Sequence, residues 1–257
     1  MQNLITLANK ALDASGAVIR PYFRSGLAAD DKADDSPVTL ADRQAEETLR
    51  AILSAATPDF GIIGEEFPSH HQGEKYVWVI DPIDGTRAFM TGRPSFTTLL
   101  ALLEDGVPVL GLIDQPVMRE RWQGGRTLKT RFSSPYGGVV GPRTTVRLAQ
   151  AELSATTPEM FRGEDMTRFE RLQHAARRVY WGGDAYAFGL LALGQIDLVA
   201  ETRLKIWDWA PLVPVIEAAG GVVTDWAGAE LKQGSDGSVL ASANRVLHEE
   251  ALAVLNA

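Results

Sequence analysis

The sequence predicts an α/β protein in which helices and strands alternate and each half of the chain contains a mixed β-sheet. Segments with apolar residues at helical spacing are followed by short runs rich in Val and Ile, from the first residues to the last. The 257 residues suffice for one large domain or two small lobes with a sizeable core. A hydrophobic content of 45% and a charged content of 23% are ordinary for a globular protein.

The chain begins with two predicted helices. Apolar residues recur at helical spacing over residues 4–22, and Gly26 helps to end that helix. The polar, Asp-rich segment 28–37 is predicted to be a mobile loop. Thr39 and Asp42 then have the spacing of a capping box, in which each residue satisfies a backbone N–H of the other at a helix start.

Four strands complete the first half. Residues 61–64 predict a short strand that leads into Glu65, and the Trp-Val-Ile run at 78–80 predicts a strand buried on both faces. Residues 96–103 and 107–113 predict a hairpin, because a Glu-Asp-Gly turn separates the two apolar runs.

The second half shows the same alternation. Its predicted strands are 152–156, 196–200 and 220–224, and its predicted helices are 167–177, 184–194, 209–219 and a last one that ends at residue 255. We therefore expect an N-terminal lobe of residues 1–140 and a C-terminal lobe of residues 141–257 in one compact unit.

Composition excludes several functions. A net charge of -8 argues against nucleic-acid binding, which requires a basic face. The absence of cysteine excludes disulfides, thiolate nucleophiles and Cys-ligated zinc, and it fits a reducing compartment. The N-terminus has no signal-peptide core, and there is no apolar run of about 18 residues that would span a membrane. We expect a cytoplasmic protein without membrane or nucleic-acid partners.

The segment W-V-I-D-P-I-D-G-T at residues 78–86 is the most informative part of the chain. A buried strand runs directly into Asp81 and Asp84, and two acids so close together repel each other unless a cation lies between them. Mg²⁺ takes such oxygen ligands. A strand that ends in an ordinary Asp-Gly turn is the alternative, and the motif alone leaves both open.

Three further acids stand at the ends of predicted elements. Glu65 follows a strand, while Asp42 and Asp208 lie at the starts of helices. Each has a purely structural alternative, as a solvated loop acid for Glu65 and as a helix N-cap for the other two.

Taken together, these segments resemble the inositol monophosphatase family. The resemblance rests on G-E-E at 64–66, on W-V-I-D-P-I-D-G-T at 78–86, and on W-D at 207–208 followed by E-A-A-G-G at 217–221. They occur in order along nearly the whole chain, and D-P-I-D-G-T is highly specific. The resemblance implies a layered αβαβα sandwich of the inositol monophosphatase and fructose-1,6-bisphosphatase type. It also implies a Mg²⁺-dependent, lithium-sensitive phosphomonoesterase and a homodimer.

The same resemblance implies a role for each acid. Two or three Mg²⁺ ions would be held by Glu65, Asp81, the Ile83 carbonyl, Asp84 and Asp208. Asp42 and Thr86, together with Glu65, would orient and activate the attacking water. This chemistry suits the residue types, because two metals roughly 3.5–4 Å apart clamp the attacking and leaving oxygens of a phosphate ester. Gly85 leaves backbone room, and amides from Thr86 onward would bind phosphate oxygens.

Other segments are similar to those of the histidinol-phosphatases within this family. They are G-G-D-A-Y-A-F-G at 182–189, I-D-Q-P-V at 113–117 with E-R-W at 120–122, and R-A-F from Arg87. Asp184, with Glu201 near it by family analogy, would attract the cationic end of histidinol phosphate. A helix N-cap is the alternative role for Asp184. The substrate-binding residues expected on this basis are Gly85, Thr86, Arg87, Asp184, Glu201 and Asp208.

Alternative functions remain open. Inositol 1-phosphate, or another small sugar or nucleotide monophosphate, is the alternative substrate, and an inactive regulatory relative is the non-enzymatic alternative. A haloacid-dehalogenase-type D-x-D-G-T site is excluded, because Pro82 stands two positions before Asp84. The segment with Pro211 and Pro214 departs from the usual family pattern, and Pro214, which has no amide N–H for the carbonyl of residue 210, predicts a tight or kinked helix start. The four histidines are expected at the surface.

Overall fold

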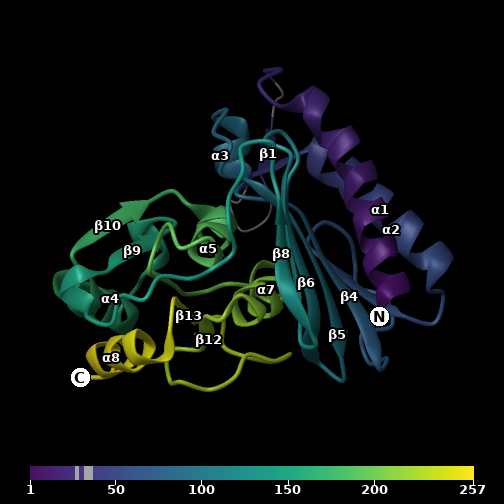
Figure 1. The fold of residues 1–257 in the computed structure, drawn as a ribbon. Helices are drawn as coiled ribbons and strands as arrows, with labels where there is room; N and C mark the ends of the chain where they lie inside the picture. The colour runs from purple at the N-terminus through teal and green to yellow at the C-terminus, as the bar shows by residue number, and fades with distance from the viewer. Residues whose placement is uncertain (27–28, 32–36) are drawn as a thin grey trace.

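A computed structural model describes residues 1–26, 29–31 and 37–257 of the chain. Five layers follow one another in the order helix, sheet, helix, sheet, helix (Figure 1). Both sheets contain parallel and antiparallel pairs. The predicted layered αβαβα sandwich with mixed sheets is therefore confirmed.

The first half builds an outer helical layer and a six-stranded sheet. The outer layer consists of α1 (Gln2–Ile19), extended by a 3-10 turn η1 (Arg20–Tyr22), and α2 (Leu40–Ala56). The sheet has the order β3-β4-β5-β6-β7-β8, with β3 parallel to β4 and the other neighbours antiparallel. Its strands are β3 (Gly61–Gly64), β4 (Tyr76–Asp84), β5 (Thr97–Glu104), β6 (Val107–Gln115), β7 (Glu120–Gly125) and β8 (Leu128–Ser133).

The second half supplies the middle helices, a five-stranded sheet and the other outer layer. The helices between the sheets are α5 (Asp184–Ala192), α6 (Ile206–Trp209) and α7 (Leu212–Ala219). The sheet has the order β10-β9-β11-β13-β12, and its strands are β9 (Glu152–Ala155), β10 (Arg178–Trp181), β11 (Leu198–Glu201), β12 (Val222–Thr224) and β13 (Val239–Ser242). The outer layer is α4 (Glu164–Ala175) and α8 (Arg245–Leu255).

Short elements connect these layers. They are α3 (Thr86–Met90), directly after β4, the 3-10 turns η2 (Leu148–Gln150) and η3 (Pro158–Met160), and the antiparallel pair β1 (Ala29–Asp31) and β2 (Pro37–Thr39). The predicted boundary at residues 140 and 141 falls between β8 and η2, and the division into two lobes stays a prediction.

Each sheet is covered on both faces, which explains the continuous apolar runs of its central strands. On β5, Leu100 and Leu102 join the core under α1 and α2, while Leu99 and Leu103 join the core shared with α5 and α7. A third core lies between the five-stranded sheet and α4 with α8. The six-stranded sheet thus has an apolar core on each face.

The structure corrects three predictions of secondary structure. The predicted helix 209–219 is split into α6 and α7 at Pro211, which has no N–H for a helical hydrogen bond. Within the segment predicted as a mobile loop, the described residues 29–31 and 37–39 pair as β1 and β2, and the remaining residues lie outside the described ones. Strands β7, β8, β10 and β13 were not predicted.

No helix within the described part of the chain is both long enough and apolar enough to cross a membrane.

Candidate active site

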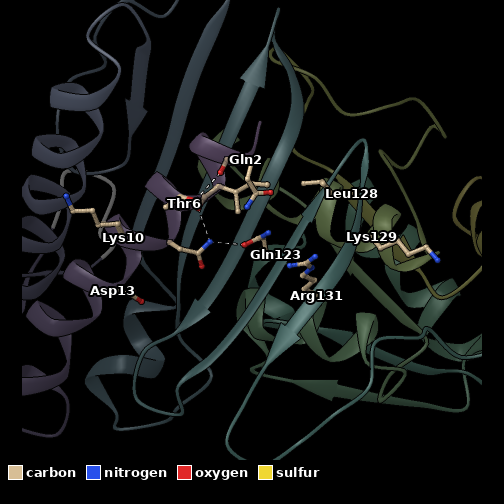
Figure 2. Close-up of a pocket in the computed structure, with 10 residues that line it drawn as sticks. Gln2, Thr6, Lys10, Asp13, Gln123, Leu128, Lys129 and Arg131 are labelled. Carbon is tan, nitrogen blue, oxygen red and sulfur yellow. Dashed lines mark hydrogen bonds between the residues drawn. The ribbon is translucent and has the colours of Figure 1, made fainter.

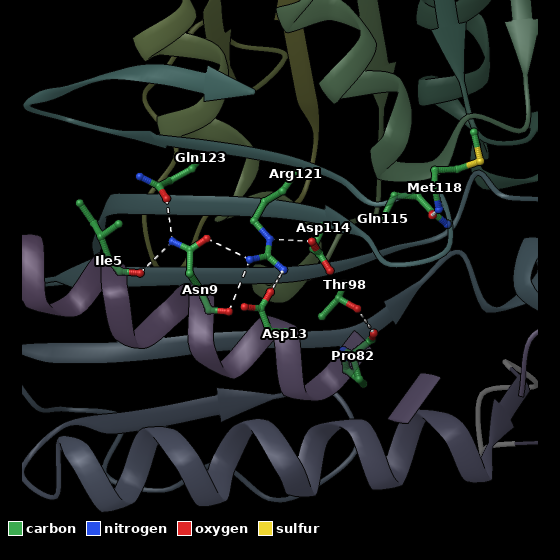
Figure 3. Close-up of polar contacts among 10 residues, drawn as sticks. All are labelled: Ile5, Asn9, Asp13, Pro82, Thr98, Asp114, Gln115, Met118, Arg121 and Gln123. Atoms are coloured by element: carbon green, nitrogen blue, oxygen red, sulfur yellow. Dashed lines mark hydrogen bonds and ion pairs between the residues drawn. The ribbon is translucent and has the colours of Figure 1, made fainter. Parts of the chain in front are cut away.

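The acidic motif lies in a β-bulge at the end of β4. Pairing between β4 and β5 shifts register between Asp81 and Asp84, and this irregularity accommodates Pro82, which has no N–H to donate to a neighbouring strand. The Thr98 hydroxyl donates to the Pro82 carbonyl at 2.8 Å (Figure 3). The Ile83 N–H donates to Asp81 Oδ1 at 3.0 Å. The bulge therefore places two carboxylates of one strand in the same site.

Asp208 joins these two carboxylates from the other half of the chain. One oxygen each from Asp81, Asp84 and Asp208 lies within 4.8 Å of the others. Asp208 is the third residue of α6, and its Oδ2 accepts from the Lys205 N–H at 2.7 Å. Lys205 therefore occupies the N-cap position that was the alternative role of Asp208, while Asp208 takes part in the cap as the acceptor of the Lys205 N–H.

Burial and like charges raise the pKa of every acid in this cluster. Burial raises the pKa of Asp81 well above its ordinary value, and the charges of Glu65 and Asp84 add to the effect. Burial, then the charges of Asp184 and Asp208, raises the pKa of Asp84 in the same way. Burial also raises the pKa of Asp208 to about 7. Carboxylates forced together in this way fit a hard divalent cation, which favours their ionised form.

Most of the predicted site residues line one small cavity of about 150 Å³. Its lining is Glu65, Asp81, Ile83, Asp84, Gly85, Thr86, Thr156, Met160, Asp184, Glu201, Leu204 and Asp208. Arg87 does not line it; this side chain lies in a neighbouring cavity of about 210 Å³, which shares Thr156 and Asp184 with the first. Nine of the predicted residues thus meet at one place, and Arg87 stands beside them.

Asp42 reaches this cavity through Thr86. The predicted capping box is present, because Asp42 Oδ2 accepts from the Thr39 N–H at 2.8 Å and the Thr39 hydroxyl accepts from the Asp42 N–H. The other oxygen, Asp42 Oδ1, lies 3.5 Å from the Thr86 hydroxyl, which is also 3.1 Å from the Ile83 carbonyl. Burial raises the pKa of Asp42 to about 6. A carboxylate with a pKa near neutrality is suited to accept a proton through the Thr86 hydroxyl.

Asp184 and Gly85 fit against each other. A Cβ atom at Gly85 would lie 2.8 Å from Asp184 Cγ, and Gly85 has a φ of +78°, so only glycine suits this position. Asp184 itself has a φ of +44°, and the N-cap of α5 is Gly183. The N-cap alternative for Asp184 is therefore wrong. Its Oδ2 instead accepts from the Ser95 hydroxyl at 3.3 Å.

Glu201 and Asp184 place two further carboxyl groups in the cavity that holds the aspartate cluster. Glu201 is the last residue of β11, is 3% exposed and accepts from the Thr156 hydroxyl at 2.7 Å. Burial raises the pKa of Glu201 to about 8 and that of Asp184 to about 6. The charge of Asp184 adds to the rise in the pKa of Glu201, whereas the charges of Arg93 and Arg87 lower the pKa of Asp184.

Three lining residues were not predicted: Thr156, Met160 and Leu204. Thr156 directly follows β9, in the same way that Glu65 follows β3. A polar residue at the end of a predicted buried strand was therefore the signal that could have identified Thr156. Met160 and Leu204 carry no comparable signal in the sequence.

A larger cavity lies elsewhere in the described part of the chain. It has a volume of about 610 Å³ and lies between α1 and the strands β7 and β8, where Lys10, Gln123 and Arg131 contribute to its lining (Figure 2). None of the clustered acids lines it. Chemistry rather than cavity size therefore identifies the candidate active site.

The fold and the site together define a metal-dependent phosphomonoesterase. Residues 1–257 match the inositol monophosphatase family over their whole length. The chain belongs to this family, as the D-P-I-D-G-T motif indicated.

Named relatives differ in the substrates that their names give. The chain is 42% identical over 261 residues to the chloroplastic bifunctional phosphatase of Arabidopsis thaliana, covering 98% of this chain and 75% of that protein. It is 35% identical to the histidinol-phosphatase of Mycobacterium tuberculosis, covering 98% of both proteins. It is also similar to the solved structure of an inositol monophosphatase from Zymomonas mobilis, with a TM-score of 0.90 and 45% identity, covering 100% of this chain and 98% of that one.

Proposed function

We propose that this protein is a Mg²⁺-dependent phosphatase that hydrolyses histidinol phosphate to histidinol and phosphate. The observation that carries the proposal is the pairing, within one cavity, of the aspartate cluster with two further acids, the half-buried Asp184 and the buried Glu201. The aspartates suit the metal-bound phosphate, and the further acids suit a cationic leaving group. Relatives named histidinol-phosphatase, 34% and 35% identical, support this substrate.

The residues around the β4 bulge would bind the metal ions that hold the phosphate group of the substrate. Glu65, Asp81, Asp84, Asp208 and the Ile83 carbonyl would hold the metal ions, two or three in number. When bound, Mg²⁺ neutralises the phosphate and lowers the pKa of a coordinated water.

In this scheme, side chains of the protein move the proton of the attacking water. The Thr86 hydroxyl accepts a proton from the attacking water and passes its own to Asp42 Oδ1, 3.5 Å away. Thr39 holds the other oxygen of Asp42 through its N–H, so the free oxygen faces Thr86. The phosphoryl group passes directly to water in this scheme, and no covalent intermediate is needed.

Asp184 and Glu201 would bind the leaving group of the substrate. Histidinol carries an ammonium group, which the Asp184 carboxylate at the cavity wall attracts by charge, and the same cation favours the ionised form of Glu201. A neutral polyol such as inositol would gain less from these charges. The similarity to a solved inositol monophosphatase nevertheless makes inositol 1-phosphate the second candidate substrate.

A phosphate-release assay with Mg²⁺ tests the proposal. The substrates are histidinol phosphate, inositol 1-phosphate and a nucleotide 3′-phosphate at equal concentrations, and we expect kcat/KM to be highest for histidinol phosphate. A higher value for inositol 1-phosphate would transfer the assignment to that substrate. No release from any of them would support the inactive relative instead.

Inhibition by Li⁺ and a homodimeric state are further parts of this proposal, and both rest on the family resemblance. Light scattering coupled to size-exclusion chromatography measures the mass in solution, which we expect to be twice the 27.9 kDa of one chain. The same release assay with added LiCl tests the inhibition.

A further inference from the structure

The turn that follows β3 is held by a buried carboxylate of α2. The side chain of Glu46 is 0% exposed. It accepts hydrogen bonds from the Glu66 N–H at 2.8 Å and from the Phe67 N–H at 3.3 Å. These two amides directly follow Glu65, so Glu46 fixes the backbone on which the Glu65 side chain is carried.

Arg50 completes this attachment one helical turn later. Its Nε donates to Glu46 Oε1 at 2.7 Å, and its Nη2 donates to the Phe67 carbonyl at 3.0 Å. The Glu46–Arg50 pair therefore bonds both polar groups of the Phe67 backbone. Because the guanidinium and carboxylate are charged and partly or fully buried, these are strong and directional hydrogen bonds.

Gly64, the last residue of β3, shows how closely the pair approaches the strand. A Cβ atom at Gly64 would lie 2.1 Å from Glu46 Oε1 and 2.7 Å from Arg50 Nη2. The backbone before Glu65 therefore lies against the pair, and the backbone after Glu65 is hydrogen-bonded to it. Glu65 is held on both sides.

Helix α2 thus serves the site at two positions on one face. Asp42 contacts Thr86, and Glu46, four residues later, holds the turn of Glu65. Glu46 is outside the group of acids whose oxygens cluster in the cavity. Its carboxylate is bonded to backbone amides and Arg50 rather than directed at a ligand.

We infer that Glu46, oriented by Arg50, is a positioning residue that sets the metal affinity of the site by fixing Glu65. This inference rests on the proposed function, in which Glu65 is a metal ligand. Residues that orient a metal ligand typically change metal affinity by roughly 10–100-fold when they are replaced.

The test is Glu46→Gln, which preserves shape but replaces one acceptor oxygen with an NH₂ group. That group must face a donor, either a backbone N–H or Arg50. We expect the Mg²⁺ dissociation constant, measured by titration calorimetry, to rise roughly tenfold or more. The Mg²⁺ concentration for half-maximal phosphate release should rise equally, with kcat at saturating Mg²⁺ within about twofold of wild type.

Glu47→Gln is the matched control, because it makes the same change at the next residue of α2, where the side chain is exposed. It should leave the Mg²⁺ affinity unchanged. Arg50→Lys keeps the charge but loses the two-pronged contact, so it should weaken Mg²⁺ binding by a smaller factor than Glu46→Gln. It also serves if Glu46→Gln does not fold.

Thermal unfolding separates positioning from mere stability. A lower melting temperature with an unchanged Mg²⁺ dissociation constant in both variants would overturn the inference. If the wild type binds Mg²⁺ but hydrolyses none of the substrates, only the proposed function is contradicted. The inference about Glu46 can still be tested, because calorimetry still compares the Mg²⁺ dissociation constants of the wild type and the variants. A wild type that binds no Mg²⁺ would overturn both.

Discussion

Two regions of this protein bury charged groups and compensate for them in different ways. Between α1 and the six-stranded sheet, Asp114 is 4% exposed and accepts from Arg121 Nε at 2.6 Å (Figure 3). Arg121 also contacts Asp13 at 2.9 Å and the Asn9 side chain at 3.0 Å. Burial raises the pKa of Asp114, but the neighbouring Arg121 opposes the shift. This region carries its own counter-charge.

The acidic cavity has the opposite arrangement. Around Asp81, the neighbouring charges are those of Glu65, Asp84 and Asp208, and each adds to the rise in pKa that burial causes. The chain thus places acids against acids around Asp81. The cations that lower a pKa in this cavity act on other acids: Lys205 on Asp208, and Arg87 and Arg93 on Asp184. Since an uncompensated buried charge destabilises a fold, the difference indicates that the acids around Asp81 fit a counter-charge from outside the chain.

The largest effect should come from Asp84→Asn. The variant removes one carboxylate of the cluster, so phosphate release with Mg²⁺ should fall by roughly a thousandfold or more for every substrate. Retained turnover would remove Asp84 from the metal site.

The same variant should be more stable than the wild type in the absence of metal. Because the folded state raises the pKa of Asp84, the ionised form destabilises the fold at neutral pH, and this effect fades as the pH falls. Relief of this destabilisation should raise the melting temperature measured without metal. An unchanged or lower melting temperature would mean that the cluster is not strained without metal.

Arg121→Met tests the compensated region. It leaves Asp114 buried without its cation and should lower the free energy of unfolding by about 3 kcal/mol in urea titrations. Arg119→Gln, at an exposed arginine two residues earlier, is the control and should change it by less than about 0.5 kcal/mol. Equal effects of the two variants would show that the ion pair with Asp114 has no special weight.

His248 is a buried titratable group that is neither paired with an opposite charge nor placed among like charges. It is kept neutral instead. The prediction that all four histidines lie at the surface is wrong here. His248 is 2% exposed, with its ring nitrogens 2.8 Å from the Ser242 hydroxyl and 2.9 Å from the Thr224 hydroxyl. Burial, followed by the charge of Arg245, lowers its pKa to about 4.

The depressed pKa of His248 implies a loss of stability in acid. Above the ordinary histidine pKa of about 6.5, neither the folded nor the unfolded chain binds a proton at this group, so His248 costs no stability there. Below that pH the unfolded chain binds the proton and the folded chain does not. The free energy of unfolding therefore decreases by about 3 kcal/mol as the pH falls from about 6.5 to about 4. Urea unfolding of His248→Asn should show a flatter pH profile than wild type over this window. Parallel profiles would contradict this account of the histidine.

A further prediction concerns the substrate end of the cavity. Asp184→Asn should raise KM for histidinol phosphate by roughly tenfold, because a charge that attracts the ammonium is lost. Hydrolysis of a small neutral aryl phosphate should barely change. Equal changes for the two substrates would remove the recognition role of Asp184.

The sequence predicted the fold well where local patterns decide it. The capping box of Thr39 and Asp42, the hairpin of β5 and β6, and the run from β4 into α3 follow from residue types and spacing. The position of the break between α6 and α7 was harder to predict, because two prolines lie in this segment. The kink was expected from Pro214, whereas the structure places the break at Pro211.

The strands that were missed are short or carry weak patterns. Strand β10 is largely exposed, and β7 has Gly, Gln and Arg among its six residues, so neither shows an apolar run. The candidate site could be predicted because its acids follow recognisable elements. The support from Glu46 and Arg50 could not, because it depends on how α2 packs against a turn that lies about 20 residues later in the chain.

Calorimetric titration of Mg²⁺ into the wild type and Asp84→Asn tests most directly whether the acidic cavity depends on a cation from outside. The comparison of the two regions predicts saturable binding to the wild type and none to the variant. Equal binding to both proteins, or no binding to the wild type, would contradict it.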